Sequence, residues 1–154
     1  MTERSATHAT FTIERTYDAS PARVFAAFAN AKEKESWFRG PPGWDVAVHE
    51  MDFRVGGREI NRVGPKGGTV HAFEARYWDI VPSQRIVFTY DMHLDDKRIS
   101  VSLTTVELKP AGAGTKLIFT EQGVFLDGWD NPAVREQGTH GLLDALGAYL
   151  GATG

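Results

Sequence analysis

The stretch from Trp44 to Gln122 constrains the fold most, because strand patterns follow one another there with no helical pattern between them. Turn residues interrupt it at Gly56-Gly57, residues 64–68, Pro82-Ser83, Asp95-Asp96 and residues 111–114. Strands joined by such short links pair only antiparallel, because a parallel crossover needs a dozen or more residues. The middle of the chain is therefore predicted to be an antiparallel meander.

Helices are predicted on both sides of this meander. Residues 11–17 alternate as a half-buried strand does, and Ser20-Pro21 then suits the N-cap and first position of a short helix. A second helical segment, Lys32 to Trp37, stops before the Gly and Pro residues of 40–43. Two short helices should therefore interrupt the sheet early.

A long helix is predicted to end the chain. Asn131-Pro132 forms an N-cap pair, and the helix runs toward Leu150 over roughly 18 residues, about 27 Å at the standard rise. It should lie across the sheet, since nothing else is left to cover its apolar side. That side is expected to consist of Val134, Leu142, Leu146 and Tyr149.

Composition excludes several classes of protein. The 154 residues suit one domain, residues 1–154, with residues 1–9 open to disorder. Without cysteine there is no disulfide, thiolate metal site or cysteine nucleophile. A net charge of -3 disfavours nucleic acid and anionic membranes as partners, and no segment resembles a membrane span or a secretory leader. We expect a cytoplasmic monomer or homodimer.

Several motifs carry a resemblance to a known family. They are residues 18–21 (DASP) leading into Val24-Phe25, Trp37-Phe38, residues 52–57 (DFRVGG), Pro82 with residues 85–87, Gly114-Thr115 and residues 120–123 (TEQG). The chain resembles the helix-grip superfamily of START-like and polyketide-cyclase-like (SRPBCC) proteins, in the branch related to the activator of the heat-shock-protein-ninety ATPase. The resemblance implies an α+β fold: a curved antiparallel sheet of about seven strands around a long C-terminal helix, with two short helices after the first strand.

The resemblance also implies a cavity between sheet and helix. Aromatic side chains are its expected lining, although each could instead belong to the core, and tryptophans beside Gly and Pro could form its mouth. Gly138 and Gly141 on the helix could leave room for a ligand or let the helix lie close to the sheet. The predicted pocket residues are Trp37, Phe38, Trp44, His71, Phe73, Phe88, Tyr90, Glu121, Phe125, Trp129, Gly138 and Gly141.

Polar candidates follow from the period-two pattern. Arg15 and Glu121 each alternate with apolar neighbours, so both should point inward, and we expect them to pair in a structural or a ligand-binding role. His71 shares a face with Phe73 and is either a general acid, base or hydrogen-bond partner, or an ordinary satisfied or exposed histidine.

One further strand is assigned a buried face by the same pattern. Its apolar residues are expected inside and its polar residues outside. The inward set is Ile99, Val101 and Leu103, and the outward set is Arg98, Ser100 and Ser102.

Three functions remain open from the sequence. There is no metal-binding histidine-carboxylate spacing, nucleophile elbow or phosphate loop, and residues 112–115 suit a hairpin turn, so no metal and no cofactor are expected. The chain could bind a small hydrophobic molecule, act as a cyclase- or hydrolase-like enzyme through Glu121, His71 or Tyr90, or serve as a chaperone ATPase cofactor. The binding function needs no catalytic geometry and is preferred.

Overall fold

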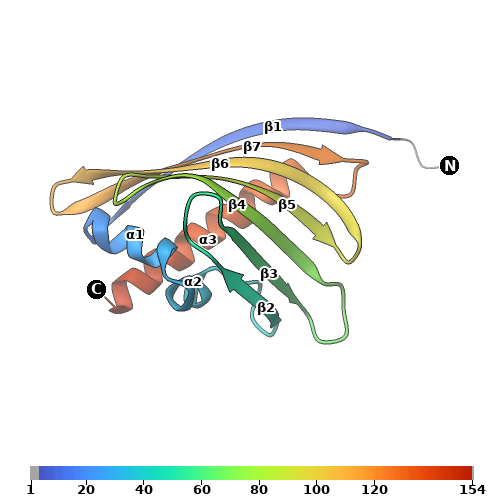
Figure 1. Ribbon diagram of the computed structural model, residues 1–154, viewed down its shortest axis with the longest axis horizontal. Helices are drawn as coiled ribbons and strands as arrows, with labels where there is room; N and C mark the ends of the chain where they lie inside the picture. The colour runs from blue at the N-terminus through green and yellow to red at the C-terminus, as the bar shows by residue number, and fades with distance from the viewer. Residues whose placement is uncertain (1–3, 154) are drawn as a thin grey trace.

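The structure is a computed structural model that describes residues 4–153. Seven strands and three helices follow one another along the chain (Figure 1). They are β1 (Ala6–Tyr17), α1 (Pro21–Ala29), α2 (Ala31–Trp37), β2 (Asp45–Met51), β3 (Arg58–Gly64), β4 (His71–Val81), β5 (Arg85–Leu94), β6 (Lys97–Ala111), β7 (Gly114–Leu126) and α3 (Pro132–Thr153).

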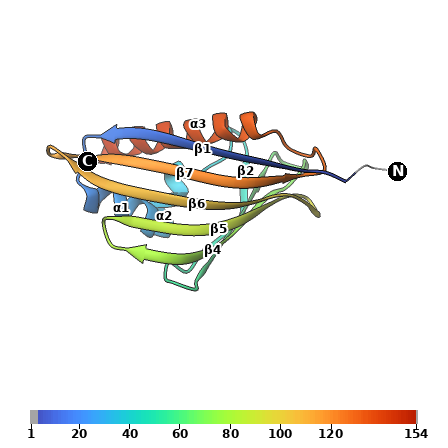
Figure 2. The same ribbon diagram turned by 90° about the horizontal axis from the view of Figure 1, so that it is seen from above.

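All seven strands belong to one antiparallel sheet in the order β1-β7-β6-β5-β4-β3-β2. Strands β2 to β7 form the predicted meander, and β1 pairs with β7. Figure 2 shows β1, β7, β6, β5 and β4 side by side in this order. The sequence left residues 1–9 open to disorder, but residues 6–9 begin strand β1. Residues 1–3 lie outside the described part of the chain.

The predicted caps start the helices. The Ser20 hydroxyl accepts a hydrogen bond from the Arg23 backbone N–H (3.2 Å), and the Asn131 amide oxygen accepts one from the Ala133 N–H (2.8 Å). Asn30 ends α1 and also caps α2. Within residues 4–153, none of the helices combines the length and apolarity needed to cross a membrane.

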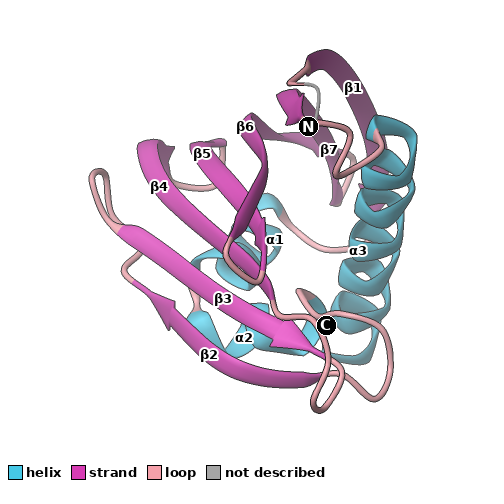
Figure 3. Ribbon diagram, turned by 90° about the vertical axis from the view of Figure 1, so that its right-hand side faces the viewer, coloured by secondary structure: helices cyan, strands magenta, loops and turns pink. Residues whose placement is uncertain are grey.

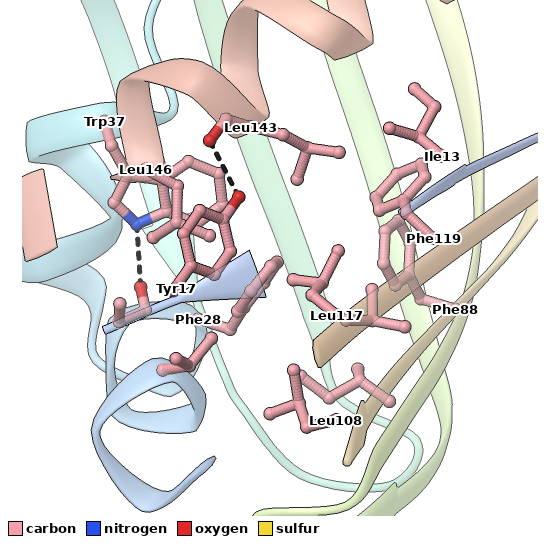
Figure 4. Close-up of a cluster of buried hydrophobic side chains, with 14 of the residues drawn as sticks. Ile13, Tyr17, Phe28, Trp37, Phe88, Leu108, Leu117, Phe119, Leu143 and Leu146 are labelled. Atoms are coloured by element: carbon pink, nitrogen blue, oxygen red, sulfur yellow. Dashed lines mark hydrogen bonds between the residues drawn. The ribbon is translucent and has the colours of Figure 1, made fainter. Parts of the chain in front are cut away.

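The sheet curves around α3, with α1 and α2 closing one end of the interior (Figures 1 and 3). Leu143, Leu146 and Leu150 of α3 are buried against the concave face, and the Tyr17 hydroxyl donates to the Leu143 carbonyl at 2.7 Å (Figure 4). Val134, expected on this side, is 58% exposed. The helix is 22 residues long, and Leu142 and Tyr149, also expected on this side, are only half-buried. The buried stripe is Thr139, Leu143, Leu146 and Leu150.

Candidate functional site

The inner face of β6 is polar from Ser100 to Thr104, contrary to the prediction for Val101 and Leu103, whereas Ile99 is buried as predicted. Ser100 and Ser102 are buried, whereas Val101 and Leu103 are 40% and 38% exposed. The reason is a bulge: Met92 pairs with Ser100 and His93 pairs with Arg98, so Ile99 is an extra residue on β6. One extra residue exchanges the two faces of everything that follows it. Polar side chains thereby enter the interior.

The Glu121 carboxylate of β7 lies at the centre of this polar region. Glu121 points inward, as predicted, and is only 3% exposed. The Tyr90 hydroxyl donates to its Oε2 at 2.9 Å, and the Thr104 hydroxyl donates to its Oε1 at 3.1 Å. These donors come from β5 and β6, whose register places both residues beside Glu121 on the concave face.

Arg135, near the start of α3, completes the cluster from the opposite side. Its guanidinium donates to the Tyr90 hydroxyl (3.0 Å), to the Ser100 hydroxyl (2.9 Å) and to the Asp130 carboxylate (2.6 Å). It also lies 3.9 Å from Glu121 and 5.2 Å from the ring centre of Phe125, which is buried. The helix and the sheet are therefore joined here by a charged hydrogen-bond network.

The predicted Arg15–Glu121 pair is wrong. Both residues are on the concave side, but Glu121 is opposite Phe11 in the β1–β7 register and Arg15 is opposite Leu117. Four residues of strand separate the two, roughly 13 Å. Arg15 instead donates to His140 Nδ1 of α3 at 2.8 Å.

Burial controls the protonation of the cluster. It raises the pKa of the Glu121 carboxyl above its ordinary value, against the opposing effects of the Tyr90 hydrogen bond and the Arg135 charge. Burial also raises the pKa of Tyr90, and the nearby Glu121 carboxylate adds to this shift. Glu121 thus holds a proton more readily than an exposed glutamate, which is a property of general acids.

The aromatic wall beside this cluster comes largely from predicted residues. The Phe73 ring lies 4.7 Å from that of Tyr90, 5.1 Å from that of Phe38 and 6.3 Å from that of Phe88, measured between ring centres. These rings come from β4, β5 and the C-terminal end of α2. The structure therefore brings Phe38, Phe73, Phe88 and Tyr90 together.

The other predicted aromatic residues are more scattered. Trp44 packs on His71 with 4.6 Å between ring centres, and burial lowers the pKa of His71. Trp129 is 41% exposed, with the Lys97 ammonium 4.2 Å from its ring. Trp37 is not a mouth residue, because it is buried between α1 and α2 and donates to the Ala27 carbonyl (Figure 4).

Gly138 and Gly141 do not face the interior, so the prediction that they line a pocket is wrong. Both are exposed, and a Cβ atom built on either meets nothing within 4 Å. The buried residue between them is Thr139, whose hydroxyl donates to the Arg135 carbonyl. The glycine stripe was assigned to the wrong side of the helix.

Sequence reasoning missed a second buried network, centred on Glu59 of β3. Lys34 and Tyr77 each donate to Glu59 Oε1 at 2.6 Å, and His49 Nε2 lies 2.9 Å from Oε2. The Lys34 ammonium also lies 4.6 Å from the Phe38 ring centre. Lys34 shares a helix face with Trp37 three residues on, which is the signal that could have revealed it.

The remaining concave features are unpaired polar atoms. Asn61 Oδ1 and Ser102 Oγ are buried without a hydrogen-bond partner among residues 4–153. Ser102 nevertheless lies near the Tyr90 hydroxyl and makes the smallest contribution to its pKa, lowering it. Alternation would have placed Asn61 outside, so no sequence signal marked it.

Two open grooves lie away from this region. One, of about 570 Å³, is lined by Pro21, residues 81–85 and residues 107–110. The other, of about 410 Å³, is lined by residues 15–18, Leu143, Asp144, Gly147, Leu150 and Gly151. Neither groove is lined by a predicted pocket residue.

A group of possible metal ligands lies in β4 and β5. One ligand atom each from Glu74, Asp91 and His93 lies within 4.8 Å of the others. Arg98 already pairs with Asp91 at 3.0 Å, and Arg62 with Glu74 at 3.5 Å. A cation would have to compete with these arginines, so the geometry alone does not define a metal site.

The class of protein follows from this architecture. A curved seven-stranded antiparallel sheet that encloses a long C-terminal helix, with two short helices after β1, is the helix-grip fold. Residues 18–151 match the model of the Activator of Hsp90 ATPase homolog 1-like protein family, and the chain belongs to that family. The predicted resemblance is thereby confirmed.

Solved structures agree with this assignment. An uncharacterized protein from Rhizobium leguminosarum is 46% identical over 98% of this chain and 99% of that chain, with a TM-score of 0.93. A protein from Rhizobium loti is 51% identical over 94% and 99% of the two chains, with a TM-score of 0.88. An AHSA1 protein from Silicibacter pomeroyi, 24% identical with a TM-score of 0.76, shares the fold over 95% of this chain and 100% of that chain. No curated protein matches the chain.

Proposed function

We propose that this protein binds a small, largely hydrophobic molecule between the concave face of the sheet and α3. The observation that carries the proposal is the polar inner face of β6, where Ser100, Ser102 and Thr104 replace the apolar residues of an ordinary core. Ser100 and Thr104 are hydrogen-bonded to Arg135 and Glu121, but the Ser102 hydroxyl is not, and burying an unpaired hydroxyl costs free energy. A few placed polar groups beside an aromatic wall are typical of ligand sites.

Native mass spectrometry of protein taken gently from its host tests this proposal. A compound bound at one per chain and released on denaturation would support it. Protein that is empty, and whose thermal unfolding midpoint is unchanged by a panel of apolar compounds, would contradict it.

A matched pair of variants locates the site. Ser102→Leu adds bulk to the interior and should weaken binding of the released compound, whereas Leu103→Phe changes the opposite, exposed face of the same strand and should not. Equal affinities in the two variants would place the ligand elsewhere. If Ser102→Leu does not fold, Ser102→Val is the smaller replacement.

An enzyme that uses the same pocket is the second candidate, and the raised pKa of Glu121 beside Tyr90 favours it. A cyclase- or hydrolase-like reaction would use Glu121 as the proton donor. Glu121→Gln should then abolish turnover of the bound compound while leaving its affinity within a few-fold. Unchanged turnover in Glu121→Gln and in Tyr90→Phe would remove this candidate.

A chaperone cofactor is the third candidate, favoured by the description of the family and by apolar side chains on the outer face of the sheet. Trp78, Val101 and Leu103 are each more than a third exposed there. A partner chaperone that docks on this face should lose affinity for Leu103→Lys. No binding to, and no stimulation of, the ATPase of the host chaperone would exclude this function.

A further inference from the structure

Two buried polar atoms on the concave face have no partner within residues 4–153. Asn61 of β3 is 5% exposed and Ser102 of β6 is 2% exposed, yet Asn61 Oδ1 and Ser102 Oγ make no hydrogen bond there. A buried polar group without a partner is expensive, and native proteins contain few of them. Each such atom therefore calls for an explanation.

The two atoms lie on strands β3 and β6, which are separated by β4 and β5 in the sheet. In the strand register Asn61 of β3 is opposite Phe73 of β4, and Phe73 is opposite Met92 of β5. Met92 is in turn opposite Ser100 of β6, so three strand spacings separate β3 from β6. Along the sheet this is roughly 14 Å, and curvature brings the inward side chains closer. Figure 3 shows β4 and β5 between β3 and β6 in the curved sheet.

Aromatic rings cover the surface between the two atoms. Phe73 and Tyr90 belong to the intervening strands β4 and β5, and their ring centres are 4.7 Å apart. Each ring contributes a large apolar face with a defined stacking geometry. A flat apolar molecule lying on these rings would reach toward Asn61 at one end and Ser102 at the other.

The neighbouring charged groups do not supply what Asn61 lacks. Its amide oxygen is an acceptor and needs a donor. Glu59, two residues away on the same face of β3, is an ionised acceptor that already receives hydrogen bonds from Lys34 and Tyr77. At the other end Glu121 likewise accepts from Tyr90 and Thr104. A ligand donor is therefore the chemistry that the Asn61 end can use, whereas the Ser102 hydroxyl can pair with a ligand donor or a ligand acceptor.

We infer that the ligand is an elongated, mainly apolar molecule with a hydrogen-bond donor, a hydroxyl or N–H, at the end that meets Asn61 and a polar group, donor or acceptor, at the end that meets Ser102. This inference rests on the proposed binding function and defines the class of ligand. It predicts that a polar group at each end raises affinity and that the donor at the Asn61 end cannot be replaced by an ether.

Four probes of one shape test the inference: trans-stilbene, 4-hydroxystilbene, 4,4′-dihydroxystilbene and 4,4′-dimethoxystilbene, titrated by calorimetry against the full chain. Each hydroxyl should tighten binding roughly three- to tenfold, the net value of one hydrogen bond. The dimethoxy compound keeps both oxygens without their donors, so it can pair with Ser102 but not with Asn61 and should bind roughly three- to tenfold more weakly than the dihydroxy compound.

The variant Asn61→Leu removes the acceptor with little change of volume. Its affinity for the dihydroxy probe should fall roughly three- to tenfold, the value of one hydroxyl, and its affinity for stilbene should not change. Without ligand its thermal unfolding midpoint should be equal to or above that of the parent, because an unpaired polar atom is gone. Arg62→Leu, on the opposite face of β3, is the matched control.

Equal binding of all four probes would overturn the inference, since ordered water would then satisfy both atoms, and would leave the proposed function standing. Failure of the dihydroxy probe to bind would also overturn it. A lowered midpoint in Asn61→Leu would show that this side chain is structural. If that variant does not fold, the probe series on the parent protein still decides.

Discussion

Two buried glutamates in the same interior, Glu59 and Glu121, have carboxyl pKa values shifted in opposite directions. Burial raises the pKa of both. At Glu59 the charge of Lys34 and the hydrogen bonds from His49, Lys34 and Tyr77 outweigh this effect and lower the pKa to about 2, whereas at Glu121 burial prevails. Glu59 is therefore a structural anion, and Glu121 is the carboxylate suited to proton transfer.

Removing the Glu59 charge should be costly. Glu59→Gln leaves the Lys34 ammonium buried without its counter-charge, and we expect the free energy of unfolding in urea to fall by about 3–5 kcal/mol. Glu50→Gln, at an exposed position of the neighbouring strand β2, should change it by less than about 0.5 kcal/mol. If Glu59→Gln lowers the free energy of unfolding by less than about 1 kcal/mol, the Lys34 ammonium must be solvated by water in the variant.

His49 should make stability depend on pH. Its hydrogen bond to Glu59 raises its pKa above the ordinary 6.5, with a further contribution from Glu35 and against the effect of burial. The resulting stabilisation is complete below about pH 6.5, the unfolded value, and is lost as the pH rises through the higher folded value. The free energy of unfolding should therefore fall on the alkaline side of neutrality.

Urea unfolding of the parent and of His49→Gln between pH 6 and pH 9 checks this expectation. The variant should be less stable at pH 6 and closer to the parent at pH 9, because glutamine does not titrate. Parallel pH profiles would contradict the assignment. Glu59 acts in the opposite direction and in acid, where its contribution is lost as the pH falls from its ordinary 4.5 through about 2.

At the scale of elements, α3 holds glycines that its packing does not need. Gly138 and Gly141 have open space where a Cβ would be. Alanine at either should stabilise the protein by about 0.5–1 kcal/mol, because glycine loses more backbone entropy in a helix. Thermal or urea unfolding of the two single variants measures this gain.

Gly147 in the same helix is the matched control. A Cβ there would lie 3.1 Å from the Tyr17 ring, so the contact should cancel part or all of the helical gain. If Gly138→Ala or Gly141→Ala destabilised the protein while Gly147→Ala did not, the helix would be rotated relative to the structure described.

For the whole molecule, closure of the sheet should govern folding speed. β1 pairs only with β7, so β1 has no partner until two segments far apart in the sequence meet. Such non-local pairing predicts refolding on the order of milliseconds to seconds. Stopped-flow dilution from urea, followed by the fluorescence of the four tryptophans, measures the rate. Refolding in microseconds would mean that local structure, rather than β1–β7 pairing, limits the rate.

The sequence by itself determined the order of elements and the antiparallel meander. These depend on local signals: the caps at Ser20 and Asn131, the turn residues between the strands, and the alternation of residues 11–17, all of which the structure confirms. Local backbone preferences act over a few residues, and a single chain displays them directly. Glu121 was found inside for the same reason.

Only the tertiary structure decided which groups meet in the interior. The bulge at Ile99 exchanged the faces of β6, the strand register separated Arg15 from Glu121, and the rotation of α3 aimed Arg135 inward and Gly138 outward. A shift of one residue in a strand, or about 100° in a helix, reverses what a side chain faces without changing the local pattern. The long-range packing of helix on sheet sets those offsets, and with them the candidate site.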